Sequence, residues 1–194
     1  MNKLLKIREF KYLSVFVVLV LIILSMSVKP ILTDVFGDEI YIKTAAYDPR
    51  DVFRGDYVSL NYEISEISID KLDYDALAIV NNDLYSNELS GEKLYVSLIR
   101  GDFYYSVDKV SLTKPSEGIY LVARYNFTLW DFDINEKENN ERFEKVRGIM
   151  VEYPLDRFYV PENTGKALEK KVRDGDAFAR IKVYKGYALL KGIH

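Results

Sequence analysis

The longest apolar stretch of the chain lies close to its start and is uniform rather than periodic. Residues 12–28 carry no charge, and twelve of the sixteen residues from Leu13 to Val28 are Leu, Ile, Val or Phe. Such a run favours insertion into a lipid bilayer by roughly −4 to −7 kcal/mol. Residues 12–28 would span about 25 Å as a helix, and Lys11 and Lys29 can reach the two interfaces. The pattern predicts a transmembrane helix over residues 12–28.

Two other interpretations of this stretch stay open. A buried core helix would normally have one polar face, and this run has none. A cleaved signal peptide needs small residues before the cut, which Ser25 and Ser27 provide, but the apolar run is long for a signal peptide. We therefore favour a signal-anchor that stays in the mature protein.

The basic residues before the apolar stretch predict its orientation. Residues 1–12 carry a net charge of +3, which keeps this end of a membrane protein in the cytoplasm. We expect a single-pass protein of the cell membrane, of bacterial type. Residues 1–32 would form the basic tip and the anchor, and residues 33–194 would form an extracytoplasmic domain.

Beyond the anchor, short apolar or alternating runs predict a domain of antiparallel strands. Turn residues separate the runs, and Lys185-Gly186 suits a two-residue hairpin turn. The predicted strands are Glu39–Tyr47, Asp56–Ile64, Ala76–Val80, Lys93–Ile99, Phe103–Val107, Ile119–Thr128, Val146–Glu152, Ala177–Tyr184 and Tyr187–Lys191.

The same pattern predicts little helix outside the anchor. One short helix is expected near the C-terminus, with a cap at Asn163 or Thr164 and a stop at Gly175. Pro30 and residues 33–38 are expected to form a connector that leaves the membrane. The predicted fold class is mainly β (α+β): one N-terminal transmembrane helix, then an antiparallel β-rich domain with one short C-terminal helix.

Charge and composition argue against several classes of function. The chain of 194 residues has a net charge of −3, so residues 13–194 carry −6, which is a poor match for nucleic acid. There is no cysteine, and the single histidine is the last residue, His194. Thiol nucleophiles, serine–histidine triads and zinc sites are therefore not expected. We expect no metal and no cofactor, and we favour a protein that is not an enzyme.

The strongest local signal is a turn that leads into a strand at residues 54–63. Gly55 permits a sharp turn, and Asp56 can hydrogen-bond the neighbouring backbone. Because side chains alternate along a strand, one face of this segment should be buried. That face would consist of Val58, Leu60, Tyr62 and Ile64.

This segment is similar to the motif of the GDYXXLXY family. The residues that carry the resemblance are Gly55, Asp56, Tyr57, Leu60 and Tyr62, together with the lead-in Asp48–Asp51 and Arg54, the pair Arg147-Gly148, and Phe158–Glu162 with Gly165. Asn163 departs from the pattern, which has a glycine after the Pro-Glu pair. The resemblance implies a membrane-anchored protein of undetermined activity with a multi-pass membrane protein as partner. It supplies no catalytic residue.

The motif has two interpretations. It is either a turn that fixes strand register, or one wall of a binding cleft lined by Arg50, Arg54 and Asp56, with Tyr57 presenting its hydroxyl. Flanking arginines would keep Asp56 ionised, which favours ion pairing or ligand orientation over general-acid catalysis.

Three functions fit these observations. We favour a non-catalytic accessory or interaction module of a membrane complex. The first alternative is an envelope sensor that binds a small polar or anionic ligand at the Arg50 and Arg54 cluster. The second is a membrane-surface hydrolase distantly like signal peptidase, but such an enzyme needs a serine and a lysine base just after its anchor. No serine lies between Val28 and Tyr57.

Overall fold

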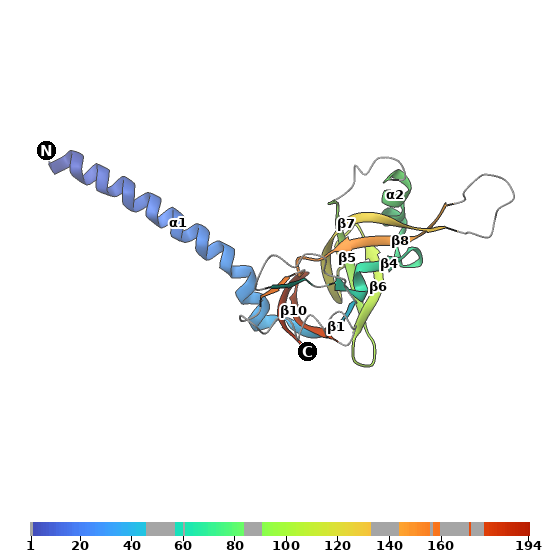
Figure 1. Ribbon diagram of the computed structural model, residues 1–194. Helices are drawn as coiled ribbons and strands as arrows, with labels where there is room; N and C mark the ends of the chain where they lie inside the picture. Colours follow the sequence, from blue (N-terminus) through green and yellow to red (C-terminus); the bar gives the residue numbers. More distant parts are fainter. Residues whose placement is uncertain are drawn as a thin grey trace.

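The chain combines one long projecting helix with a β-rich domain, as the computed structural model shows (Figure 1). The structure describes residues 2–45, 57–59, 61–83, 91–132, 144–155, 157–159, 171 and 177–194. Helix α1 (Asn2–Phe36) leads directly into β1 (Asp38–Ala45). The later elements are β2 (Tyr57–Ser59), β3 (Asn61–Tyr62), η1 (Glu63–Ser65), β4 (Glu66–Ser68), η2 (Ile69–Lys71), α2 (Tyr74–Asp83), β5 (Lys93–Arg100), β6 (Tyr105–Ser111), β7 (Ile119–Phe132), β8 (Glu144–Glu152), β9 (Arg157–Tyr159), β10 (Phe178–Tyr184) and β11 (Tyr187–Ile193).

Two antiparallel sheets enclose one hydrophobic core. The first sheet has the strand order β11-β10-β1-β3, and the second has the order β4-β8-β7-β5-β6, while β2 and β9 form a separate pair. Alternate residues of each sheet point inward, as the period of a strand requires. The largest fully buried side chains include Ile40, Ile42 and Ile181 of the first sheet and Leu94, Leu121, Tyr125 and Ile149 of the second. The predicted β-rich fold class is confirmed.

Most of the predicted strands are present, but the one at residues 76–80 is wrong, because these residues lie in helix α2. The Asp73 carboxylate accepts a hydrogen bond from the Ala76 backbone N–H at 2.9 Å, which is an N-terminal helix cap. Ala76 and Val80, four residues apart, are both buried on one helix face. The apolar run was too short to distinguish a strand from a helix.

The predicted strand at Asp56–Ile64 is divided in the structure. Its described part forms the short strands β2 and β3, and the chain then makes a 3-10 turn at η1 before β4. Tyr62 and Ile64 are buried, as the alternation predicted. Strands β4 and β9 were not predicted. The predicted C-terminal helix lies outside the described residues apart from Lys171, which is helical.

The predicted connector after the anchor is wrong, because α1 continues to Phe36 with Pro30 inside it. A proline removes one helical hydrogen bond and costs about 3 kcal/mol in a helix interior. The last turns of the helix contact β10 and β11 of the first sheet. Thr33 is fully buried, and its Oγ1 donates a hydrogen bond to the Lys29 carbonyl oxygen at 2.9 Å.

The predicted hairpin turn at Lys185-Gly186 is confirmed. The two residues have φ values of +50° and +83°, and Tyr184 pairs with Tyr187. Positive φ at both central positions defines the turn that best fits the twist of two adjacent strands.

Candidate functional site

Most of the site predicted at the motif lies outside the described residues. Arg50, Arg54, Gly55, Asp56 and Leu60 belong to that group. The backbone of Tyr57 begins β2 and pairs with Tyr159 of β9. Tyr62, the last motif residue, is fully described and joins the motif to a distant segment.

The hydroxyl of Tyr62 connects the motif to the segment after β8. Tyr62 is 3% exposed, and its hydroxyl donates a hydrogen bond to the Leu155 carbonyl oxygen at 2.6 Å. In return, the hydroxyl of Tyr153 donates to the Ile64 carbonyl oxygen at 2.9 Å. Burial raises the pKa of the Tyr153 phenol well above its usual range, so this hydroxyl stays protonated. We call these two reciprocal bonds the tyrosine junction.

Gly148 of β8 allows the strand after the motif to approach closely. It pairs with Ser68 of β4, and a Cβ at position 148 would overlap the carbonyl oxygen of Ile67. Only glycine therefore fits here without a backbone shift. The pair Arg147-Gly148 carried part of the family resemblance, and the structure supplies a steric reason for its glycine.

An open groove lies beside the motif, where the first sheet meets the second. Its volume is about 520 Å³, within the range of small-molecule sites. Polar and apolar side chains line it together. The lining residues are Ala45, Asn61, Tyr62, Glu63, Ser65, Glu66, Ile67, Ser68, Leu129, Arg147, Gly148 and Met150.

The charged groups of this groove are paired with each other or with a neighbour. The Arg147 guanidinium donates to Glu66, and both side chains are about half exposed. The carboxylate of Glu63 lies 2.7 Å from the ammonium of Lys43. Such an arrangement can orient a polar ligand or an extended peptide, since the guanidinium can exchange one carboxylate for another.

The described residues bring no serine–lysine site together. A serine–lysine mechanism needs a desolvated lysine beside the serine, and no lysine side chain is buried in the described part of the chain. Within the same residues, no group of three or more acidic or histidine side chains is placed to hold a metal ion.

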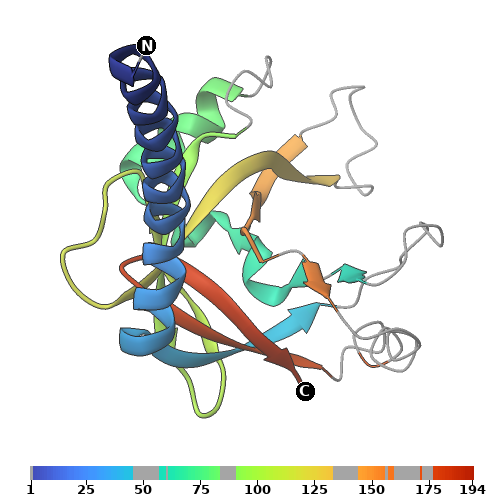
Figure 2. The same ribbon diagram turned by 90° about the vertical axis from the view of Figure 1, so that its left-hand side faces the viewer.

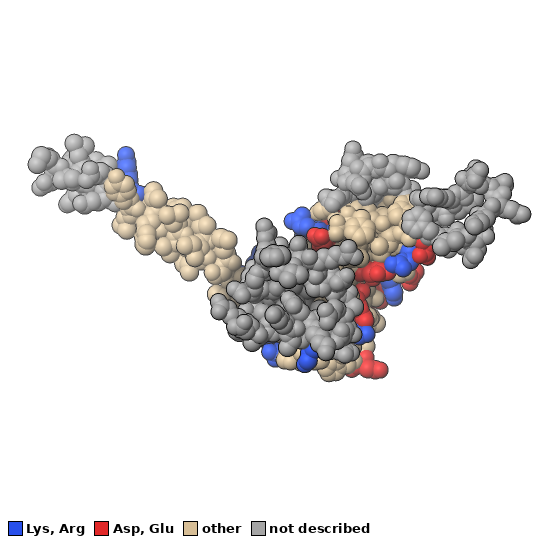
Figure 3. All heavy atoms as spheres, in the orientation of Figure 1, with Lys and Arg blue, Asp and Glu red and all other residues tan. Residues whose placement is uncertain are grey.

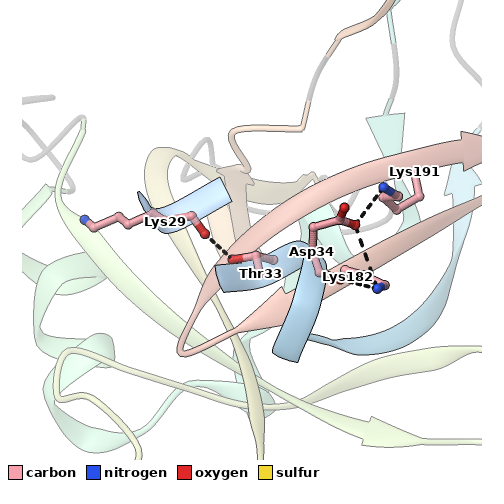
Figure 4. Close-up of polar contacts among 5 residues, drawn as sticks. All are labelled: Lys29, Thr33, Asp34, Lys182 and Lys191. Atoms are coloured by element: carbon pink, nitrogen blue, oxygen red, sulfur yellow. Dashed lines mark hydrogen bonds and ion pairs between the residues drawn. The ribbon is translucent and has the colours of Figure 1, made fainter. Parts of the chain in front are cut away.

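A second site joins the end of α1 to the first sheet (Figure 4). The Asp34 carboxylate accepts a hydrogen bond from Lys191 Nζ at 2.8 Å and lies 3.8 Å from Lys182 Nζ. The same Lys182 ammonium also donates to the Asp34 backbone carbonyl oxygen. This bond satisfies one of the carbonyls that a helix leaves open at its C-terminus. We call this cluster the helix junction.

Gly37 makes the helix junction compact. A Cβ at this position would overlap the carbonyl oxygen of Thr33 and would approach Lys182 Cβ to 3.3 Å. The backbone N–H of Gly37 donates to the same Thr33 oxygen at 3.0 Å. The chain therefore turns directly from α1 into β1, with one residue between them. Sequence reasoning missed this site because its partners lie about 150 residues apart in the chain.

Helix α1 is long and apolar enough to cross a membrane over Lys11–Phe36, and it is the one such helix among the described residues. Its most apolar part is not buried in the domain, whereas Thr33, close to its end, is buried. On the face that Figure 3 shows, no charged side chain is visible on the helix between Lys11 and the domain. The helix and the junction together define a protein with an N-terminal apolar helix, suited to anchoring in a membrane, that continues into a β-rich domain.

Comparison with protein families identifies this chain more closely. Residues 19–193 match the family described as GDYXXLXY protein, so the chain belongs to that family. The match includes about half of α1 and the described domain up to residue 193, and it confirms the resemblance. No curated protein and no solved structure matches the chain.

Proposed function

We propose that this protein is an accessory or interaction module of a membrane complex, held by α1 in the bilayer at a fixed orientation. In this proposal α1 is retained and crosses the membrane once. Its basic end lies in the cytoplasm, and residues 33–194 form an extracytoplasmic domain. The basic tip and the apolar residues 12–28 support that orientation.

One observation carries the proposal: the apolar helix passes into the domain without a flexible linker. A domain joined to its anchor by a flexible linker samples many heights and orientations, because the composition of the linker sets its stiffness and reach. Here the buried Thr33, the compact Gly37 and the ion pairs of Asp34 restrict rotation about the anchor. A fixed height and orientation are useful when the binding partner is itself embedded in the same membrane, because less rotational freedom is lost on binding.

The test is to co-purify the full-length protein from native membranes in a mild detergent. We expect an integral membrane protein to be recovered with it. A short Gly-Ser insertion between Phe36 and Asp38 keeps the anchor and the domain but removes the fixed orientation, and it should abolish recovery of the partner. The same insertion after Asp102, in the exposed bend between β5 and β6, is the matched control. Recovery of this chain alone, or equal recovery with both insertions, would contradict the proposal.

Orientation can be tested separately. A reporter fused to the C-terminus should be active outside the cytoplasm, whereas a tag before Lys3 should be protected from protease in intact cells. A cytoplasmic C-terminus would contradict the proposed topology. Loss of the N-terminal tag from the mature protein would show that α1 is cleaved.

The groove beside the motif favours a second candidate function, a sensor of a small anionic ligand. An anion at Arg147 would have to replace the carboxylate of Glu66. Glu66→Gln should therefore strengthen binding of small carboxylates, measured as a larger rise in melting temperature, and Arg147→Gln should remove it. If the rise in melting temperature with small carboxylates is the same in both variants as in the parent protein, the groove does not bind small anions in this way.

A further inference from the structure

A basic surface rich in tyrosine lies beside the end of α1. It contains three exposed lysines, each with its ammonium group above the ring of a tyrosine. The distances from Nζ to ring centroid are 4.7 Å for Lys93 over Tyr95, 5.9 Å for Lys114 over Tyr120 and 5.2 Å for Lys185 over Tyr184. We call these six residues the lysine–tyrosine face.

Contacts between side chains make this face continuous with α1. The Tyr184 ring packs against Phe36, the last residue of α1, with centroids 6.3 Å apart. The turn that follows Tyr184 is fixed to β7, because the Val122 N–H donates to the Gly186 carbonyl oxygen at 3.2 Å. On β7 and β5, the rings of Tyr120 and Tyr95 lie 5.9 Å apart.

The charge of the face differs from that of the whole chain, whose net charge is −3. Arg124 adds a fourth cation, since it pairs with Lys93 across β5 and β7. Carboxylates also lie nearby: Glu92 directly precedes Lys93, Glu117 lies in the turn before β7, and Glu152 is opposite Arg124. None of the three lysines forms an ion pair with a described carboxylate. Their charges remain available to an external anion.

Lys185 occupies a backbone position that usually takes another residue. Its φ is +50°, and two-residue turns of this kind strongly prefer Asn, Asp or Gly there. A lysine in the left-handed region costs stability compared with those residues. This cost is consistent with a role for the exposed ammonium group that a smaller residue could not fill.

The position of α1 places this face near the bilayer surface. From Lys29, where the charge-free stretch ends, to Phe36 the helix rises about 10 Å. The polar headgroup layer is about 5 to 8 Å thick on each side of the hydrocarbon. Figure 2 views the domain from the side on which α1 emerges, and in this view the turn before β7 and β7 itself are drawn on either side of the helix.

We propose that the lysine–tyrosine face binds the anionic phospholipid headgroups of the membrane that α1 crosses. Lysine extends its ammonium group to phosphate, and tyrosine is enriched where apolar and polar layers meet. Tyr95 and Tyr184 are half-buried and can take this position, whereas Tyr120 is buried beneath them. Together with α1 the face would provide a second contact with the bilayer and would restrict tilting of the domain. The inference rests on α1 lying in a bilayer and is independent of the accessory role, because its test needs no partner.

The test uses the full-length protein in lipid nanodiscs. Because the chain has no cysteine, Ser97→Cys gives a single labelling site on the outer side of β5, opposite Tyr120. A dye attached at this position is quenched by phosphatidylcholine that carries a nitroxide on its headgroup, if the two come into contact. We expect strong quenching when phosphatidylglycerol is present and weak quenching in phosphatidylcholine alone.

Charge reversal provides the decisive comparison. Lys93→Glu with Lys185→Glu should remove the dependence on phosphatidylglycerol, since each lysine near an anionic surface contributes roughly fivefold to the docked population. The matched control, Lys43→Glu with Lys71→Glu, changes the same charge on β1 and η2, away from the lysine–tyrosine face, and should behave like the unmodified protein. Lys93→Gln with Lys185→Gln should give an intermediate result.

Three outcomes would overturn the proposal. The first is equal quenching with and without phosphatidylglycerol. The second is an equal loss of quenching in the test and control variants. The third is the absence of any quenching. If quenching is absent in nanodiscs while the thiol of the Ser97→Cys variant is protected from a thiol reagent in native membranes, a protein partner covers the face instead of lipid.

Discussion

The tyrosine junction and the helix junction both connect distant segments of this chain, but they use different chemistry. In the tyrosine junction, two buried hydroxyls donate to backbone carbonyls, with Tyr62 and Tyr153 each no more than 5% exposed. In the helix junction, the charged side chains remain between 25% and 50% exposed. A buried carbonyl that loses its donor has no water to replace it, whereas separated surface charges are readily hydrated.

This difference indicates separate roles for the two junctions. The tyrosine junction is part of the folded core, so breaking it should destabilise the whole domain. The helix junction sets the orientation of the domain relative to α1, so weakening it should change geometry and leave the domain folded. The motif that defines the family thus has a structural role at its last residue, Tyr62, while the contact that serves the proposed function lies elsewhere.

The largest expected effect is that of Gly148→Ala. The added Cβ would overlap the Ile67 backbone, and because a backbone carbonyl cannot rotate away, β4 must separate from β8. We expect the free energy of unfolding to fall by roughly 3 kcal/mol, at the upper end for an overpacked site. Urea unfolding of the full-length protein in detergent measures it.

Gly192→Ala is the control for this experiment. Its Cβ would meet only the His194 ring at 3.4 Å, and its backbone does not need a positive φ. A small loss of unfolding free energy in Gly192→Ala, together with a large loss in Gly148→Ala, would locate the steric constraint at the contact between β4 and β8. Equal effects at both positions would contradict the interpretation.

The next effect in size is that of removing each hydroxyl of the tyrosine junction. Tyr62→Phe and Tyr153→Phe each leave a buried carbonyl without its donor, which costs about 1 to 2 kcal/mol of unfolding free energy. The two changes should be non-additive in the double variant, because they act on the same pair of segments. Tyr74→Phe, at a side chain that is 87% exposed, should be neutral. If Tyr62→Phe also leaves the free energy of unfolding unchanged, the motif tyrosine does not have the proposed structural role.

A pH experiment separates the hydroxyl of Tyr153 from the other tyrosines. Its pKa is raised by burial in the folded state, while in the unfolded chain it is about 10. Below that pH the folded state keeps its full stability. Above it the unfolded chain releases the proton first, and stability falls by about 1.4 kcal/mol per pH unit. Tyr153→Phe lacks this loss, so the difference in stability between the two proteins should shrink as pH rises above about 10. A constant difference would mean that Tyr153 is not buried as a phenol.

The sequence was sufficient for local features and insufficient for contacts between distant segments. The uniform apolar run, the alternation that buries Tyr62 and Ile64, and the hairpin at Lys185-Gly186 all depend on neighbouring residues, and the structure bears them out. Helix α2 was missed because tertiary burial decides between helix and strand for a short apolar run. The tyrosine junction joins residues about 90 positions apart, and the pairing of two such segments cannot be read from local spacing.

The smallest expected effect on stability concerns Asp34, and it tests the comparison most directly. Asp34→Asn removes the charge that attracts Lys182 and Lys191, and because all three groups are partly exposed, unfolding of the domain should change by less than about 1 kcal/mol. The geometry should change more, since Asp34 helps to hold the end of α1 on β10 and β11. Spin labels on cysteines introduced at Ser27 and Ser97 should give a broader distance distribution in the variant than in the parent. Asp38→Asn, an exposed acidic residue four positions later, is the matched control and should leave the distribution unchanged. If Asp34→Asn instead destabilises the domain as much as Tyr62→Phe does, then the helix junction belongs to the folded core and the distinction between the two junctions is wrong.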